Sequence, residues 1–402
     1  MALCISCENI QLPIVTNGQA ADGHELHRSV AKLTASARTC RLCALFLDAI
    51  SGTRLKGIRH DAVRLFPWAS DAAGDPVGLS RVFVRVGDKV GRFVNVHAEP
   101  DSAAARAGFA IGRPMSAQCD FELLQQWLSN CCTNHSCSIG RPPEGLPARF
   151  IKINNEGMVP ELHLVSSRDV SSRYAALSYC WGGNFTGIKT TKATLEQHHT
   201  YIEPSRLPKT IRDATQITRA LGIEYLWVDS LCIVQDDQED WAAESKRMAA
   251  LYQSAVVTLV ATAAKDANQG CLFPRNVTRD SVDVQLSVDM ARDTSKVTFT
   301  NHTGSIADDF LESPWNKRAW CLQEYVLSPR MLHFFENRIV WQCRGTLSAE
   351  DFVELRRSAG AGAGADFRVQ HILTTPSSYF SLRPPADLET WFRLVEYSPR
   401  GA

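Results

Sequence analysis

Four cysteines near the beginning of the chain have the spacing of a zinc site. They form two C-x-x-C pairs that are 32 residues apart: Cys4, Cys7, Cys40 and Cys43. Two such pairs supply four thiolates to a tetrahedral structural Zn²⁺, which leaves no open position for catalysis. His24 and His27 lie between the pairs and could replace a ligand or hydrogen-bond to one. The alternative is a set of buried thiols that packs a small helical leader.

A second group of metal-binding residue types follows Trp127 and Leu128, at a predicted helix end. Its members are Cys131, Cys132, His135 and Cys137. Ligands so close in sequence could bind a metal, but their geometry would be crowded. Core packing, or contact with the first cysteine group, is the interpretation that the short spacing favours.

Glu244 is the carboxylate with the strongest case for chemistry. Helical spacing places it on or beside an apolar stripe that contains Trp241 and Met248. A carboxylate there must be paired or functional, because an unpaired buried charge is costly. The structural alternative is a salt bridge, with Arg318 or Arg212 as the partner.

Composition excludes several classes of protein. The 402 residues are 45% hydrophobic, and Lys+Arg and Asp+Glu both number 43, so we expect no nucleic-acid partner. The N-terminus lacks a basic and apolar signal, and 13 cysteines is an odd count, so we expect a cytoplasmic protein without a disulfide framework. The longest apolar stretch, 249–264, is interrupted by polar residues, so we expect no integral membrane segment.

From residue 174 onward, short apolar runs alternate with amphipathic helices. The runs at 174–180, 225–228 and 256–260 predict buried strands, and helices are expected at 211–221 and from about Glu239. This pattern predicts an α/β fold with a parallel sheet and helices on both faces. Residues 325–341 predict a hairpin, whereas 265–313 show no sustained period and read as an irregular insertion.

The same pass along the chain predicts four parts. They are a cysteine-rich region at 1–140, a linker with a lead-in strand at 141–173, the main domain at 174–345 and a C-terminal segment at 346–402. The glycine-alanine run at 358–365 reads as a flexible loop.

Three segments resemble the fungal heterokaryon incompatibility (HET) domain. They are YAALSYCWGG from Tyr174, LWVDSLCIVQDDQEDWAAESKRMAALY from Leu226, and RAWCLQEYVLSPRMLHF from Arg318. The resemblance implies a flavodoxin-like parallel sheet related to TIR domains, preceded by a small cysteine-rich leader. Family members usually continue beyond a point equivalent to residue 402, so it also implies a truncated C-terminal segment.

The resemblance implies a self/non-self recognition factor that triggers programmed cell death. In one version the domain cleaves NAD⁺, and Glu244 resembles the glutamate of TIR-type NADases. That residue would stabilise the oxocarbenium-like transition state, so Glu244→Gln would abolish killing without weakening the fold. In the other version the domain is a non-catalytic, oligomerising module that recruits other death factors, and Glu244 belongs to a salt bridge. The expected partners are further copies of the chain and other incompatibility proteins.

The ligand-binding residues are expected at the carboxyl ends of the predicted strands, in a crevice that also contains Glu244. They are Ser178, Tyr179, Trp181, Gly182, Asp229, Trp241 and Arg318. The aromatic rings could stack on a base, and Gly182 could let the backbone approach a phosphate. The alternatives are edge-of-core packing for the rings, a turn cap for Asp229 and an ion pair for Arg318. Trp320, Gln323 and Glu324 belong to the same block as Arg318.

Overall fold

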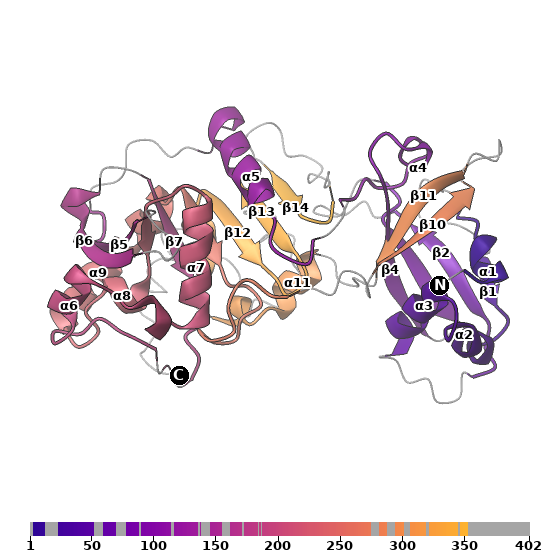
Figure 1. The fold of residues 1–402 in the computed structure, drawn as a ribbon, viewed down its shortest axis with the longest axis horizontal. Coiled ribbons are helices and arrows are strands. Elements are labelled where there is room, and N and C mark those ends of the chain that lie inside the picture. The colour runs from indigo at the N-terminus through magenta and orange to yellow at the C-terminus, as the bar shows by residue number, and fades with distance from the viewer. Residues whose placement is uncertain are drawn as a thin grey trace, which may run out of the picture.

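The computed structural model contains two large β-sheets, each with its own hydrophobic core (Figure 1). It describes residues 3–12, 23–51, 59–69, 78–87, 90–113, 116–135, 137, 145–154, 161–170, 173–183, 185, 187–274, 281–287, 294–300, 306–318, 321–344 and 346–352. The loop predicted at 358–365 and nearly all of the segment predicted at 346–402 lie outside these residues.

The first sheet is antiparallel, with the strand order β1-β2-β3-β4-β11-β10. Its strands are β1 (His24–His27), β2 (Val63–Trp68), β3 (Arg81–Val86), β4 (Val90–Ala98), β10 (Ser281–Ser287) and β11 (Thr294–Thr300). The helices beside it are α1 (Ile5–Glu8), α2 (Val30–Ser36), α3 (Arg41–Ser51) and α4 (Ala103–Arg106). Every second side chain of β3 is buried, so one face of the sheet forms the core with α3.

The second sheet is mixed, with the order β14-β13-β12-β9-β7-β8-β5-β6. Its strands are β5 (Arg149–Asn154), β6 (Glu161–Ser166), β7 (Tyr174–Ser178), β8 (Tyr225–Trp227), β9 (Val257–Val260), β12 (Arg330–Phe334), β13 (Ile339–Cys343) and β14 (Leu347–Ala349). The inner strands β12, β9, β7 and β8 run parallel, and the outer pairings on both sides are antiparallel.

Helices connect and cover the strands of the second sheet. They are α5 (Phe121–Asn134), α6 (Leu195–Thr200), α7 (Lys209–Ala220), α8 (Asp229–Cys232), α9 (Gln238–Ser254), α11 (Ile306–Glu312) and α12 (Cys321–Leu327). Single 3₁₀ turns occur at η1 (Ser167–Asp169), η2 (Pro204–Arg206) and η3 (Trp315–Lys317). Helix α7 connects β7 to β8 and α9 connects β8 to β9, and such crossovers make these three strands parallel.

The predicted flavodoxin-like fold is wrong. Most strand pairings are antiparallel, because β5–β6 and β12–β13–β14 are consecutive strands whose connections contain no crossover helix. The region before residue 140 is also more than a small leader, since it supplies four strands of a separate sheet. The α/β pattern holds only for β7, β8 and β9, which helical crossovers connect, and it does not extend to the rest of the chain.

Several local elements of the second sheet are confirmed. The strands predicted from residues 174, 225 and 256 are β7, β8 and β9, and the predicted hairpin is β12–β13. The helix predicted at 211–221 is α7, which ends at Ala220, and Gly222 follows its C-cap with a φ of +69° that suits glycine. The N-cap of α9 is Asp237, which accepts hydrogen bonds from the backbone of Glu239 and Asp240.

The irregular insertion predicted at 265–313 is wrong. It contains the hairpin β10–β11, and β11 pairs with β4 of the first sheet. Side chains alternate between buried and exposed along β10, so the missed signal was a period of two over only seven residues. The insertion therefore adds two strands, orange in Figure 1, to a sheet whose other strands all come from the first 98 residues.

Candidate functional site

A buried polar network lies at the carboxyl ends of β7 and β8. Ser178 is the last residue of β7, and Asp229 begins α8 directly after β8. Glu324 comes from α12, which is distant in sequence. Glu324 is 3% exposed, and Asp229 is partly buried. The fold therefore assembles one site from all three segments that suggested the family resemblance.

One half of the network surrounds Glu324. The Ser178 hydroxyl donates a hydrogen bond to the Glu324 carboxylate, and the indole Nε1 of Trp315 donates to Ser178 Oγ at 2.5 Å. The hydroxyl of Tyr252 on α9 also hydrogen-bonds to Glu324. Two hydroxyl groups thus donate to one buried carboxylate, which meets the need of a charged group in a core for hydrogen-bond partners.

The other half surrounds Asp229. Trp181 Nε1 donates to Asp229 Oδ2 at 2.8 Å, and the backbone N–H of Ser230 donates to Oδ1 at 2.7 Å. The hydroxyl of Tyr179 donates to Ser230 Oγ at 3.0 Å. Both oxygens of Asp229 are therefore occupied, and Asp229 is more than the turn cap that we considered.

Burial and Arg318 have opposing effects on these carboxyl groups. Burial raises the pKa of Asp229 and of Glu324 above the ordinary carboxyl range, although the charge of Arg318 and the hydrogen bonds counteract it. Burial alone would lower the pKa of Arg318, but its attraction to Glu324, Cys180 and Asp229 raises it. Arg318 is thus the cation shared by both carboxylates.

Trp181 extends the network to the surface. Its ring lies 4.8 Å from that of Phe185, and Lys189 Nζ lies 5.1 Å from the Trp181 ring centroid. Gly182 has a φ of +88°, and a Cβ there would lie 2.6 Å from Cβ of Asp266. Glycine is required at this position by the turn itself. A role for Gly182 in binding a phosphate stays a prediction.

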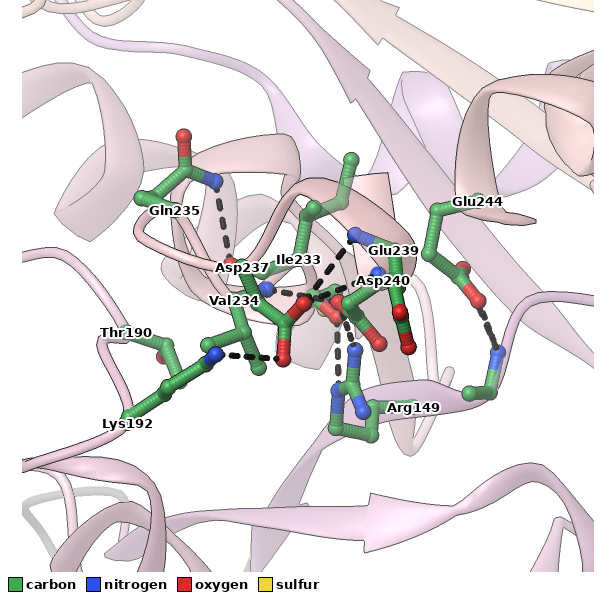
Figure 2. Close-up of polar contacts among 12 residues, drawn as sticks. Arg149, Thr190, Lys192, Ile233, Val234, Gln235, Asp237, Glu239, Asp240 and Glu244 are labelled. Carbon is green, nitrogen blue, oxygen red and sulfur yellow. Dashed lines mark hydrogen bonds and ion pairs between the residues drawn. The ribbon is translucent and has the colours of Figure 1, made fainter. Parts of the chain in front are cut away.

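Glu244 lies in a different set of contacts. Its carboxylate accepts hydrogen bonds from the backbone N–H of Ala148 at 3.1 and 3.2 Å and pairs with Arg247 at 2.6 Å. One turn earlier on α9, Asp240 pairs with Arg149 at 2.5 Å (Figure 2). Two carboxylates of α9 therefore hold the beginning of β5. These are the contacts of the salt-bridge alternative, although its partner is neither Arg318 nor Arg212.

The predicted apolar stripe of α9 is only partly correct. Leu251 and Tyr252 are buried, but the side chain of Trp241 is 51% exposed. The helix buries a carboxylate at Glu244 where an amphipathic pattern would have an apolar residue, which explains why the stripe was misplaced. A ligand-binding role for Trp241 stays a prediction.

Residues 174–324 match the family model described as Heterokaryon incompatibility protein (HET). This segment is a HET domain. The chain is 24% identical over 185 residues to Heterokaryon incompatibility protein 6, OR allele, of Neurospora crassa, and the alignment covers 38% of this chain. It covers 27% of that protein, so the chain spans about a quarter of its relative's length. No solved structure matches the chain.

The match begins at the first residue of β7 and ends at Glu324, so the HET domain contains the whole buried network. The resemblance to the HET family is confirmed. Nothing in the match supports the further link to TIR domains. Among the described residues, every helix is too short or too polar to cross a bilayer.

The first cysteine group lies outside the HET domain and converges as predicted. The sulfur atoms of Cys4, Cys7, Cys40 and Cys43 all lie within 4.8 Å of one another. Individual S–S distances are 3.4 Å for Cys7–Cys43, 3.5 Å for Cys4–Cys43 and 3.6 Å for Cys40–Cys7. A tetrahedral zinc with Zn–S bonds of about 2.3 Å would place its sulfurs about 3.8 Å apart. The four thiols could therefore bind a metal ion, and they are compatible with structural zinc.

His27 supplies a further contact to this group. Its Nε2 lies 3.2 Å from Cys43 Sγ, where an N–H can donate to a metal-bound thiolate. Hydrogen bonds from Cys7, and further ones from His27 and Cys4, lower the pKa of Cys43 to about 5. His24 lies on the same strand, outside the group of four thiols.

We expect Cys40→Ser to remove one Zn²⁺ per chain and to destabilise the first sheet while the second sheet stays folded. Cys40 precedes α3, so its loss would release that helix from Cys7 of α1 and from Cys4, the N-cap of α1. Elemental analysis of protein purified without chelator, together with limited proteolysis, measures both effects. Wild-type protein with less than about 0.2 Zn per chain would contradict the prediction, since structural sites are normally filled.

The sequence alone did not reveal two features of these sites. Glu324 was grouped with Arg318, but its bond to Ser178 joins residues 146 positions apart. The second is Cys343, whose Sγ lies 3.4 Å from Nδ1 of His135 in the second cysteine group; it stands alone at the end of a strand. In the sequence, Cys343 is a cysteine that follows a short apolar run, and this alone does not indicate a metal ligand.

Proposed function

We propose that this chain acts in heterokaryon incompatibility as a recognition module that signals through binding. The HET domain and the name of the Neurospora crassa relative support the biological role. The observation that supports signalling through binding concerns Glu244. Its buried carboxylate accepts hydrogen bonds from the backbone of Ala148 and from the side chain of Arg247. These contacts join α9 to the beginning of β5, which supports a structural role for Glu244 and, with it, the binding module.

The polar network of the HET domain supports the same proposal. Asp229 and Glu324 receive their hydrogen bonds from residues of the domain, and these bonds connect β7, α8 and α12. Such a network fixes the relative positions of the three segments. The surface around Trp181, Phe185 and Lys189, which rests on this network, is where we expect a partner protein or a second copy to bind.

Expression of the chain in a fungal host tests the role of Glu244. We expect Glu244→Gln to leave killing intact and to lower the free energy of unfolding by about 1.5 to 3 kcal/mol, the usual value of hydrogen bonds to a charged group. The matched control is Glu239→Gln, an exposed position on the same helix. Viability staining and urea unfolding provide the measurements. Loss of killing with unchanged stability would instead assign Glu244 to catalysis.

Cleavage of NAD⁺ is the second candidate, and one observation favours it. Catalytic acids often have raised pKa values, and burial raises those of Asp229 and Glu324. Incubation of the concentrated protein with NAD⁺, with chromatographic detection of nicotinamide, tests this candidate. Nicotinamide release that Glu324→Gln abolishes would favour the enzyme over the binding module.

A further inference from the structure

A second cluster of metal-ligand atoms lies where α5 meets β13 (Figure 1). Its members are Cys131, His135, Cys137 and Cys343. Their ligand atoms all lie within 4.8 Å of one another, and the three cysteines are buried. Cys131 and His135 are one helical turn apart, so they share a face at the end of α5. Cys343 arrives from the end of β13, 208 residues after His135.

We propose that this cluster is a second structural zinc site, with three cysteines and one histidine as ligands. Cys343 Sγ lies 3.4 Å from His135 Nδ1. A tetrahedral zinc with Zn–S of about 2.3 Å and Zn–N of about 2.0 Å would place these two atoms about 3.5 Å apart. The side chains are therefore already positioned for the metal, and little movement would be needed to bind it.

The charges around the cluster also suit zinc. Three thiolates and a neutral imidazole around Zn²⁺ have a net charge of −1, which is costly in a core unless it is compensated. Arg330 is 6% exposed, and its Nε lies 3.2 Å from Cys131 Sγ. Arg330 is also the cross-strand partner of Cys343 in the β12–β13 pair. The charge of Arg330 therefore balances the net charge of the site, and its N–H donates a hydrogen bond to the ligand Cys131. Metal ligands in proteins commonly accept such hydrogen bonds from neighbouring residues.

The cluster differs from the crowded set that sequence spacing suggested. Cys132 was grouped with Cys131, but its side chain is exposed and the fourth position belongs to Cys343. The long-range ligand relieves the crowding, since only three ligands come from the short segment. With four protein ligands the site has no open position for a substrate, so its role is structural. It joins the end of α5 to β13 of the second sheet.

Zinc content of the full chain tests the proposal. We expect two Zn²⁺ per wild-type chain by elemental analysis and by native mass spectrometry, and one in Cys343→Ser. The matched control is Cys132→Ser, which changes the neighbouring exposed cysteine and should retain two. Cys40→Ser should also retain one, because it removes the other site, and the double variant Cys40→Ser, Cys343→Ser should retain none. Cys343→Ser protein that retains as much zinc as Cys132→Ser would overturn the proposal.

A ligand exchange covers the case in which Cys343→Ser does not fold. We expect His135→Cys to keep two Zn²⁺, because four thiolates also bind zinc, whereas His135→Ala should lose affinity for one. In the cobalt-substituted protein, His135→Cys should change the visible spectrum of one site only. Equal zinc content and equal spectra in all these variants would overturn the proposal. So would a non-reduced wild-type mass that shows a Cys131–Cys343 disulfide.

Discussion

Arg318→Met is expected to lower the free energy of unfolding of the HET domain by about 3 to 5 kcal/mol, the usual result of removing one partner from a buried charge group. The charge of Arg318 acts on both Asp229 and Glu324; Glu324 is buried and Asp229 is partly buried. Without it, each carboxylate keeps its hydrogen bonds but loses its counter-charge. Urea unfolding followed by tryptophan fluorescence measures the loss.

Lys317→Met is the matched control, because Lys317 is the exposed neighbour of Arg318. We expect it to change stability by less than about 0.5 kcal/mol. The double variant Arg318→Met, Glu324→Gln should recover part of the loss, since the amide removes one uncompensated charge. A loss below about 1 kcal/mol in Arg318→Met, or no recovery in the double variant, would mean that Arg318 does not compensate these carboxylates.

The pH dependence of the Arg318→Met defect follows from the same charges. Both carboxyl groups have a pKa that is raised in the folded protein, so the folded state binds protons more tightly than the unfolded state. Their contribution to stability is fully present below the unfolded carboxyl pKa of about 4 and is lost as pH rises through the folded pKa. The defect should therefore be largest at neutral pH and should shrink toward pH 4.

Local signals predicted the middle of the second sheet well. The strands β7, β8 and β9 are continuous apolar runs, and the helices between them have caps that can be recognised in sequence. The direction of the outer strands could not be predicted from local signals. Whether a short strand pairs parallel or antiparallel depends on the connection that leads to it. The pairing of β11 with β4 joins residues about 200 positions apart, so no local sequence pattern predicts it.

The site was predictable to the extent that its residues end strands. Trp181 and Asp229 were expected at one edge, and the structure joins them by a hydrogen bond of 2.8 Å. Glu244 was also expected at this edge. A carboxylate in an apolar stripe is equally consistent with a functional site and with a structural salt bridge, so the sequence could not distinguish the two. Its actual partner, the backbone of Ala148, has no sequence signature, since any residue has an N–H group to offer.

His333 on β12 is expected to make the HET-containing sheet sensitive to acid. Its ring is fully buried among aromatic rings, with the centroid of Phe310 at 4.6 Å and that of Trp315 at 5.8 Å. Burial lowers the pKa of His333 to about 3. The unfolded chain takes up a proton at about pH 6.5, so stability that is present above that pH is lost as pH falls toward the folded pKa.

We expect His333→Phe to remove this acid sensitivity. From the two pKa values, His333 accounts for about 2 kcal/mol of the stability lost between pH 7 and pH 5. Phenylalanine fits the aromatic surroundings, and Thr262 Oγ1, which contacts His333 Nδ1 at 3.4 Å, keeps its bond to the carbonyl of Val260. Urea unfolding at pH 7 and pH 5 measures how much stability each protein loses between these pH values. The control is His60→Phe, which changes an exposed histidine. Equal acid sensitivity in wild type and His333→Phe would show that His333 is not the group that titrates, because all other buried groups, Asp229 and Glu324 included, are shared by the two proteins.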